Sequence, residues 1–258
     1  MRLMKRILSA AAVLALSASL LVGCSSGTAS SVPVSASSAA ESTVSSVEKT
    51  ASSAVDENEA AAAQLLNDLT GSYQELWPVI LADEYKQTWL DDCTALVGEE
   101  NAEAAFEKLS SMVTSDVYGE DAVEAYANGG GAYFCGFTNS LATLTFDGET
   151  STISGTDKDG NVLFSHTYHY IGMEPVRGLY EFQSDDADSG EFTYFFLAPD
   201  TSAETYHIEF RYGSDAEALS QYDTGEYAYW LASGISTDCD QTMIDNCIEL
   251  FCTENLAG

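Results

Sequence analysis

The fold is decided by the stretch Thr205-Tyr206-His207-Ile208-Glu209-Phe210-Arg211-Tyr212, along which polar and apolar side chains alternate. Side chains of a β-strand point alternately to opposite faces, so one face of this segment is aliphatic and aromatic while the other is polar. The polar face places the imidazole of His207 beside the carboxylate of Glu209 and the guanidinium of Arg211. Two interpretations stay open, namely part of a metal site or a polar network in which Arg211 pairs with Glu209.

Further strands precede this segment and are separated by turn sequences. The alternating run Leu141–Phe146 ends at Asp147-Gly148, a dipeptide typical of hairpin turns, and Asp157-Lys158-Asp159-Gly160 predicts another turn. Short antiparallel strands at this spacing are typical of a small barrel or sandwich. The other strands are expected at Tyr133–Phe137, Ser151–Gly155, Val162–Tyr170, Gly178–Gln183, Glu191–Leu197 and Tyr206–Tyr212.

Helical patterns flank the strands on both sides. Apolar residues recur at helical spacing within Gly71–Ala127, most clearly in Glu99–Met112. Asp240 is expected to cap a C-terminal helix with one apolar stripe. The predicted fold class is therefore α+β, with N-terminal helices, an antiparallel sheet and a C-terminal helix. The stripe consists of Met243, Ile244, Cys247, Ile248 and Phe251.

The first residues have the form of a bacterial lipoprotein leader. Three basic residues precede an apolar run that is too short to be a comfortable membrane span. The run ends in Leu21-Val22-Gly23-Cys24, which has the form of a lipobox. We therefore expect a signal peptide over residues 1–23 and lipid attached to the thiol of Cys24, which would hold the protein on the outer face of a bacterial membrane. An ordinary signal peptide that happens to contain a cysteine is the weaker alternative.

The composition of the remaining chain limits its function. Residues 24–60 are mostly Ser, Ala, Val, Thr and Glu, which predicts a flexible tether before a domain at 61–258. The leader holds three of the nine basic residues, so six face 41 acidic ones in the mature chain. No basic patch can be assembled from so few cations, and nucleic-acid binding is excluded. Phosphate loops, nucleophile elbows and metalloprotease motifs are absent from the sequence, and we expect a protein that is not an enzyme.

Five cysteines follow the anchor, and an odd number leaves at least one thiol unpaired. None forms a C-x-x-C motif, so a redox centre or a thiolate zinc knuckle is disfavoured. We expect most of them to be small buried apolar residues. Pairing of Cys239 with Cys247 or Cys252, or of Cys93 with Cys135, stays open.

The order of several segments resembles the ZinT family, whose members are periplasmic zinc-binding proteins or C-terminal domains of zinc-uptake lipoproteins. The resemblance runs from about Leu69 to the C-terminus and implies a calycin- or lipocalin-like antiparallel β-barrel with helical additions. Matching segments include an aromatic block, a Y-x-Y-x-G step and the final strand with its histidine. They are Gly71–Pro78, Tyr168–Gly172, Arg177–Phe182, Thr193–Pro199, Thr205–Ile208 and, more loosely, Tyr227–Trp230.

The metal ligands of the family are matched only in part. Its zinc is held by one histidine after the Y-x-x-F strand and by both histidines of an H-x-H motif. In this chain Phe195 and Thr205 occupy two of those positions, and His207 matches the third. A site built here is expected to draw on His207 and Glu209, with other donors in reach. The candidates are His166 and His169, which face opposite sides of a strand, and a carboxylate such as Asp200.

The resemblance implies extracytoplasmic binding of a divalent cation, zinc foremost, as an accessory to a metal-uptake system. The alternative is a metal-free barrel that holds a small organic ligand or docks a protein partner. Three neutral imidazoles on a rigid barrel suit zinc well, whereas one imidazole needs other donors. The two functions differ in whether two more ligand-capable groups lie within coordination distance of His207.

Overall fold

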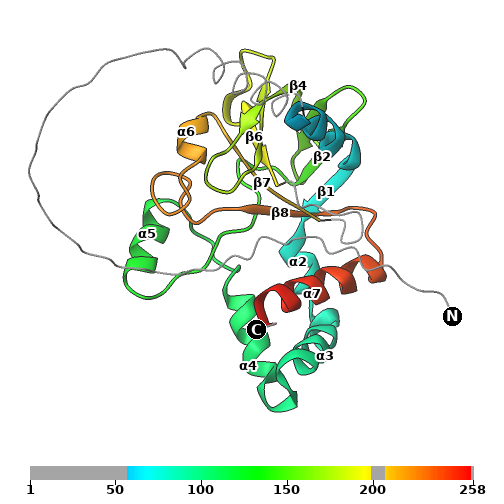
Figure 1. Cartoon of the computed structure of the whole chain (residues 1–258), viewed down its shortest axis with the longest axis vertical. Coiled ribbons are helices and arrows are strands. Elements are labelled where there is room, and N and C mark those ends of the chain that lie inside the picture. The colour runs from blue at the N-terminus through cyan, green and yellow to red at the C-terminus, as the bar shows by residue number, and fades with distance from the viewer. Residues whose placement is uncertain (1–56, 199–206, 257–258) are drawn as a thin grey trace, which may run out of the picture. The chain divides into compact units, whose positions relative to one another are not determined.

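A closed barrel of eight antiparallel strands forms the centre of the computed structural model, which describes residues 57–198 and 207–256. Each strand pairs with the next one along the chain, and the first pairs with the last to close the ring (Figure 1). The α+β fold class with an antiparallel β-barrel is thus confirmed. The strands are β1 (Gly71–Glu75), β2 (Thr143–Asp147), β3 (Thr152–Thr156), β4 (Val162–Met173), β5 (Tyr180–Ser184), β6 (Tyr194–Leu197), β7 (His207–Gly213) and β8 (Ala232–Ser236).

The predicted turns hold the hairpins in register. Asp147 accepts hydrogen bonds from the backbone N–H groups of Glu149 and Thr150 at the β2–β3 turn. Asp157 does the same for Asp159 and Asn161 at the β3–β4 turn. Such aspartate turns satisfy backbone donors that the bend leaves without strand partners.

Aromatic rings fill the interior of the barrel. Phe195 on β6 lies between Phe210 and Tyr212 of β7 and Phe164 of β4, with ring centroids 5.4–6.3 Å apart. All four side chains are buried. Rings of this size at these separations pack efficiently and account for much of the apolar burial. The barrel is therefore a packed core rather than an open cup.

A helix over residues 57–68 covers one end of this core. Its apolar side chains, including Leu65 and Leu66, join the cluster inside the barrel. Gly148 in the β2–β3 turn lies against the end of the helix. A Cβ atom at Gly148 would fall 2.4 Å from the Cα atom of Asn67, so only glycine allows this approach.

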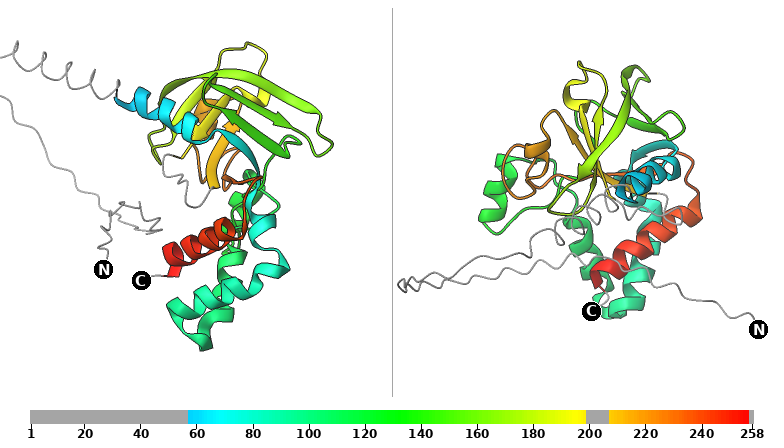
Figure 2. Two further views of the ribbon diagram at one scale, coloured as in Figure 1. Left: turned by 90° about the vertical axis from the view of Figure 1, so that its right-hand side faces the viewer. Right: turned by 45° about the horizontal axis from the view of Figure 1, so that its top comes forward.

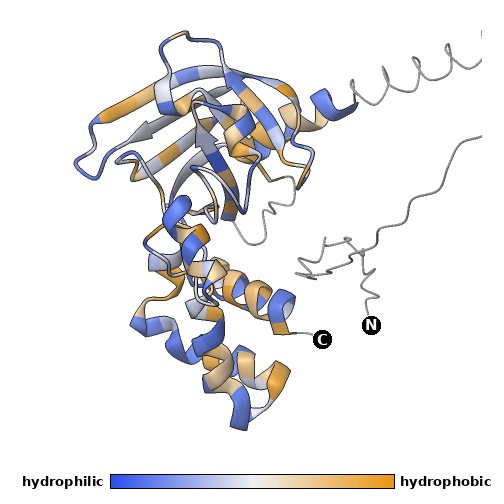
Figure 3. Ribbon diagram, turned by 90° about the vertical axis from the view of Figure 1, so that its left-hand side faces the viewer, coloured by the Kyte–Doolittle hydropathy of each residue, from blue (hydrophilic) through white to orange (hydrophobic). Residues whose placement is uncertain are grey.

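A second core lies between the barrel and a layer of helices (Figures 1 and 2). Trp89 is fully buried there and donates a hydrogen bond to the carbonyl oxygen of Ile80, while Phe251 packs edge-on against Trp77. In Figure 3 both apolar and hydrophilic residues colour these helices, as expected for amphipathic elements. The layer contains α2 (Leu76–Ile80), the 3₁₀ turn η1 (Asp83–Tyr85), α3 (Lys86–Val97), α4 (Glu99–Ser111) and α7 (Gln241–Leu256).

The remaining helices are short. They are α5 (Glu120–Ala127), α6 (Ala216–Leu219) and the 3₁₀ turn η2 (Gly190–Phe192). The carboxylate of Asp215 caps α6, and Asp240 caps α7 as the sequence predicts. None of the helices within the described ranges has the length and hydrophobicity needed to span a membrane.

Two expected elements were wrong, and one strand was missed. Gly71–Glu75 is the first strand of the barrel rather than part of a helix, because its backbone pairs with both β2 and β8. Tyr133–Phe137 is not a strand and makes only single bridges, from Phe134 to Thr114 and Trp230. The closing strand β8 was not expected. Its sequence, Ala-Ser-Gly-Ile-Ser, has a single large apolar residue and gives no alternating pattern.

Candidate metal centre

The strand β7 separates its side chains onto two faces, as its sequence predicts. Ile208, Phe210 and Tyr212 belong to the core inside the barrel. His207 and Glu209 therefore point together to the outer face, and each is partly buried. The pairing of His207 with Ile235 of β8 agrees with this assignment, because Ile235 belongs to the core shared with the helices. Imidazole and carboxylate thus lie side by side at the junction of barrel and helical layer.

A buried thiol lies close to this pair. Glu209 is opposite Ser233 of β8, and the backbone N–H of Ser233 donates to the carbonyl oxygen of Cys135. Burial first, and then the negative charge of Glu209, raise the pKa of the Cys135 thiol to about 12. Cys135 stays protonated at neutral pH as a result. A bound cation would favour its thiolate, the form that coordinates metals.

The described residues supply a partial donor set. Among them, no three His, Cys, Asp or Glu side chains converge in the geometry of a metal site. Zinc takes four ligands, with three from protein where a water fills the fourth position. His207 and Glu209 provide two donors of suitable chemistry. Asp200 and Thr205, which the resemblance brought into consideration, lie outside the described residues.

The other two histidines do not join His207, contrary to the expectation that one of them lies nearby. His166 and His169 are on β4, and β5 and β6 separate this strand from β7. His166 packs against Phe164 and Tyr168 on the inner side of β4, whereas His207 faces outward. His169 is exposed on the opposite side of β4. The strand period puts His166 and His169 on opposite faces of β4, and the order of strands in the barrel keeps both of them away from β7.

Each β4 histidine instead binds an aspartate that follows β5. The Nδ1 atom of His166 lies 2.7 Å from a carboxylate oxygen of Asp186, and that of His169 lies 2.6 Å from Asp185. These carboxylates fix the orientation of both rings and leave only Nε2 for any further partner.

Phe195, at the position of a family ligand, is fully buried in the barrel. It packs against Phe164 and Tyr168 on one side and Tyr212 on the other. Its side chain points away from the face that carries His207. Any rebuilt site on β7 is therefore separate from the Phe195 position.

The guanidinium of Arg211 does not pair with Glu209, although their spacing on the strand suggested it. Arg211 is fully buried on the outer face of β7, and its terminal nitrogens donate to the carbonyl oxygens of Leu219, Gln221 and Tyr227. It also stacks on the ring of Tyr222 at 4.4 Å. Burial lowers its pKa to about 10. Arg211 is a structural cation that holds the segment after α6.

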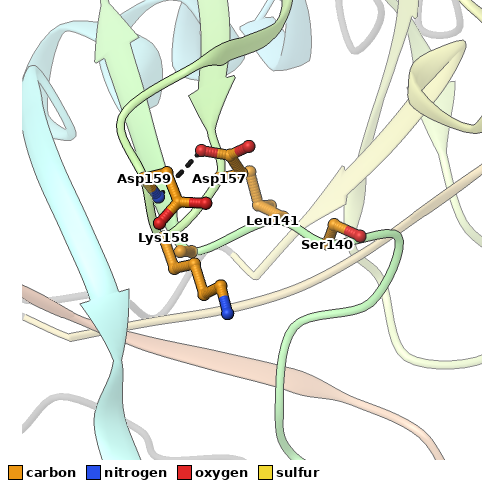
Figure 4. Close-up of a pocket in the computed structure, with 6 residues that line it drawn as sticks. Ser140, Leu141, Asp157, Lys158 and Asp159 are labelled. Atoms are coloured by element: carbon orange, nitrogen blue, oxygen red, sulfur yellow. Dashed lines mark hydrogen bonds between the residues drawn. The ribbon is translucent and has the colours of Figure 1, made fainter.

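Surface depressions among the described residues are shallow. One depression of about 370 Å³ lies beside the β3–β4 turn, between Ser140, Leu141 and Asp157–Asp159 (Figure 4). The carboxylate of Asp157 is already used by the turn, as the dashed line in Figure 4 indicates. This depression is an open part of the hairpin surface, whereas sites for organic ligands enclose most of the ligand.

Comparisons with known proteins found similar chains among the solved structures. No protein-family model matches it, and no curated protein matches it either. The Zn(II)-bound ZinT-like domain of AdcA from Streptococcus pneumoniae is similar with a TM-score of 0.45 and 15% identity, over 71% of this chain and 89% of that one. Zn(II)-bound AdcA from the same organism is similar with a TM-score of 0.42 and 14% identity, over 72% of this chain and 35% of that one. The barrel that the sequence resemblance implies is the barrel observed here.

Proposed function

We propose that the protein binds a divalent cation, zinc foremost, on the outer face of β7 with His207 and Glu209 as ligands, and that it serves metal uptake outside the cell without catalysing a reaction. The observation that carries the proposal is the adjacency of these two partly buried donors on one face of a rigid strand. A neutral imidazole beside a carboxylate is part of many zinc sites. The strong acidity of the chain supports it, because a negative surface raises the local concentration of cations.

The interior of the barrel argues against the alternative function. A small organic ligand needs an enclosed apolar space, and here rings such as Phe195 and Phe210 occupy it. An internal ligand would have to displace several packed aromatic side chains. Docking of a protein partner is left as the metal-free possibility, and the metal titration below distinguishes the two.

Zinc binding to the mature protein should depend on His207. In calorimetric titration we expect His207→Ala to weaken zinc binding at least tenfold, because it removes the only imidazole on this face. Glu209→Gln should weaken it less, since an amide oxygen is still a donor. His169→Ala is the matched control and should bind like the unchanged protein, because its side chain lies on β4. Affinity should also fall below about pH 6.5, where imidazole takes up a proton.

Two results would overturn this assignment. Equal affinity in the His207→Ala variant and the unchanged protein would remove His207 from the site. No zinc binding in any of the proteins would favour the metal-free docking function.

We also propose that the chain is exported and anchored through lipid on Cys24, which lies outside the described residues. The lipobox supports this location. Cys24→Ala should abolish incorporation of labelled lipid and leave an unanchored or unprocessed protein. Lipid labelling of the variant at the normal level would refute the anchor.

A further inference from the structure

Two buried cysteines meet where α3 and α7 pack together. The sulfur atoms of Cys93 on α3 and Cys252 on α7 lie 3.9 Å apart, and both side chains are fully buried. A disulfide requires the two sulfur atoms to come within about 2.05 Å, so they must approach by a further ~2 Å. Rotation of a cysteine side chain about its Cα–Cβ bond moves the sulfur atom by a distance of this order.

The same interface carries charges that repel. Asp92, next to Cys93, has its pKa raised by burial and by the carboxylates of Glu249 and Asp245 on α7. One oxygen atom of its carboxylate is buried without a hydrogen-bond partner. Like charges across a helix contact weaken it. Apolar packing around Trp89 and Phe251 holds α7 in place against this repulsion. A covalent link between α3 and α7 would stabilise the contact further.

We propose that Cys93 and Cys252 form a structural disulfide that ties α7 to α3 in the exported protein. The inference rests on the proposed location outside the cytoplasm, where disulfides persist. The two cysteines are 159 positions apart, so the bond closes most of the domain into one loop. A cross-link over so long a loop strongly restricts the unfolded chain.

The bond forms by thiol–disulfide exchange with an oxidant disulfide, either a thiol–disulfide oxidoreductase or glutathione disulfide. The thiolate of one cysteine attacks the oxidant and releases one of its sulfurs as a thiol. The second cysteine then displaces the other sulfur. The protein loses two electrons and two protons, and the oxidant gains them and becomes the dithiol of the oxidoreductase or two molecules of glutathione.

Burial sets the time at which this exchange takes place. Burial raises the pKa of the thiols of both Cys93 and Cys252, and neither thiol is accessible in the native state. Exchange needs an accessible thiolate, so the bond is expected to form while the chain folds and to resist reduction afterwards. Cys239, which is partly exposed, serves as the internal reference for an accessible thiol.

Peptide mapping of the mature lipoprotein under non-reducing conditions tests the proposal. We expect one peptide that joins Cys93 to Cys252, and complete alkylation of Cys239. The melting temperature of the oxidised protein should exceed that of the reduced protein by roughly 5–15 °C. Cys93→Ala, Cys252→Ala and the double variant should each lose this difference, whereas Cys247→Ala, also buried on α7, should keep it.

Quantitative alkylation of Cys93 and Cys252 in the unreduced, denatured protein would overturn the proposal, as would a link from either one to a different cysteine. The mapping uses the unchanged chain, so it decides the question even if a variant fails to fold. Zinc affinity is measured in a separate titration. Failure of the disulfide is therefore distinguishable from failure of the metal site.

Discussion

Between about pH 10 and pH 12 the barrel is expected to unfold in one cooperative step, because five buried tyrosines oppose ionisation in the native state. Burial is the first cause of the raised pKa at each one. It raises the pKa of Tyr73 and Tyr222 to about 12 and raises that of the other three still further. Those three are Tyr168, Tyr212 and Tyr227.

The direction of the effect follows from which state holds more protons. An exposed phenol of the unfolded chain ionises near pH 10, whereas the buried phenols keep their protons above it. Each such tyrosine therefore lowers the free energy of unfolding by about 1.4 kcal/mol per pH unit above ~10. Five of them remove up to roughly 7 kcal/mol per pH unit, which is comparable to the whole stability of a typical domain. Below pH 10 this contribution to stability is fully present.

Circular dichroism and phenolate absorbance, recorded during one alkaline titration, should report the same midpoint. Tyr73→Phe is the matched variant, because its ring packs edge-on against Phe146 and remains after the hydroxyl is removed. We expect it to match the unchanged protein at pH 7 and to raise the alkaline midpoint by roughly a few tenths of a pH unit. Ionisation of all tyrosines near pH 10, with the circular dichroism still native, would contradict the explanation.

Arg211→Ala is expected to lower the free energy of unfolding by about 3–5 kcal/mol, since it leaves a cavity and deprives buried carbonyl oxygens of their donors. The guanidinium bonds to main-chain oxygens of Leu219, Gln221 and Tyr227, so the loss should concentrate in the segment after β7. Urea unfolding gives the magnitude. Faster amide hydrogen exchange over residues 216–229 gives the location.

Two further variants show which property of Arg211 stabilises the segment. Arg211→Lys keeps the charge but cannot serve several carbonyl groups or stack as a plane, so its loss should be intermediate. Arg177→Ala is the control, because Arg177 stacks on the same Tyr222 ring at 4.2 Å but is only partly buried. It should lose about 1 kcal/mol. A loss below that value for Arg211→Ala would mean that the segment is held by other contacts.

The sequence predicted the strands in which polar and apolar residues alternate or which end at a turn sequence. The alternation of residues 205–212 gave the correct faces of β7 from His207 onward, and the turn residues Asp147 and Asp157 marked two hairpins correctly. The sequence pattern did not predict β1 and β8. Each has five residues and becomes a strand because it pairs with strands that are distant in the sequence. Local sequence holds no information about such pairing.

The candidate site was predictable only within one strand. Strand periodicity is enough to place His207 and Glu209 on one face. It gives no relation between β7 and β4, so the separation of His166 from His207 had to come from the order of strands in the barrel. Cys135 was missed as a neighbour of Glu209, because an irregular segment brings it there through one backbone hydrogen bond to Ser233. No sequence pattern marks that contact.

The pairing of β1 with β8 also determines when the barrel can close. Tyr73 lies beside Ser236, so the ring closes between strands near the two ends of the domain. Such non-local pairing gives a high contact order and slow folding. During synthesis β1 emerges early and β8 almost last, and in that interval the backbone edge of β1 is open to other chains. The ring can therefore close only after β8 has been made.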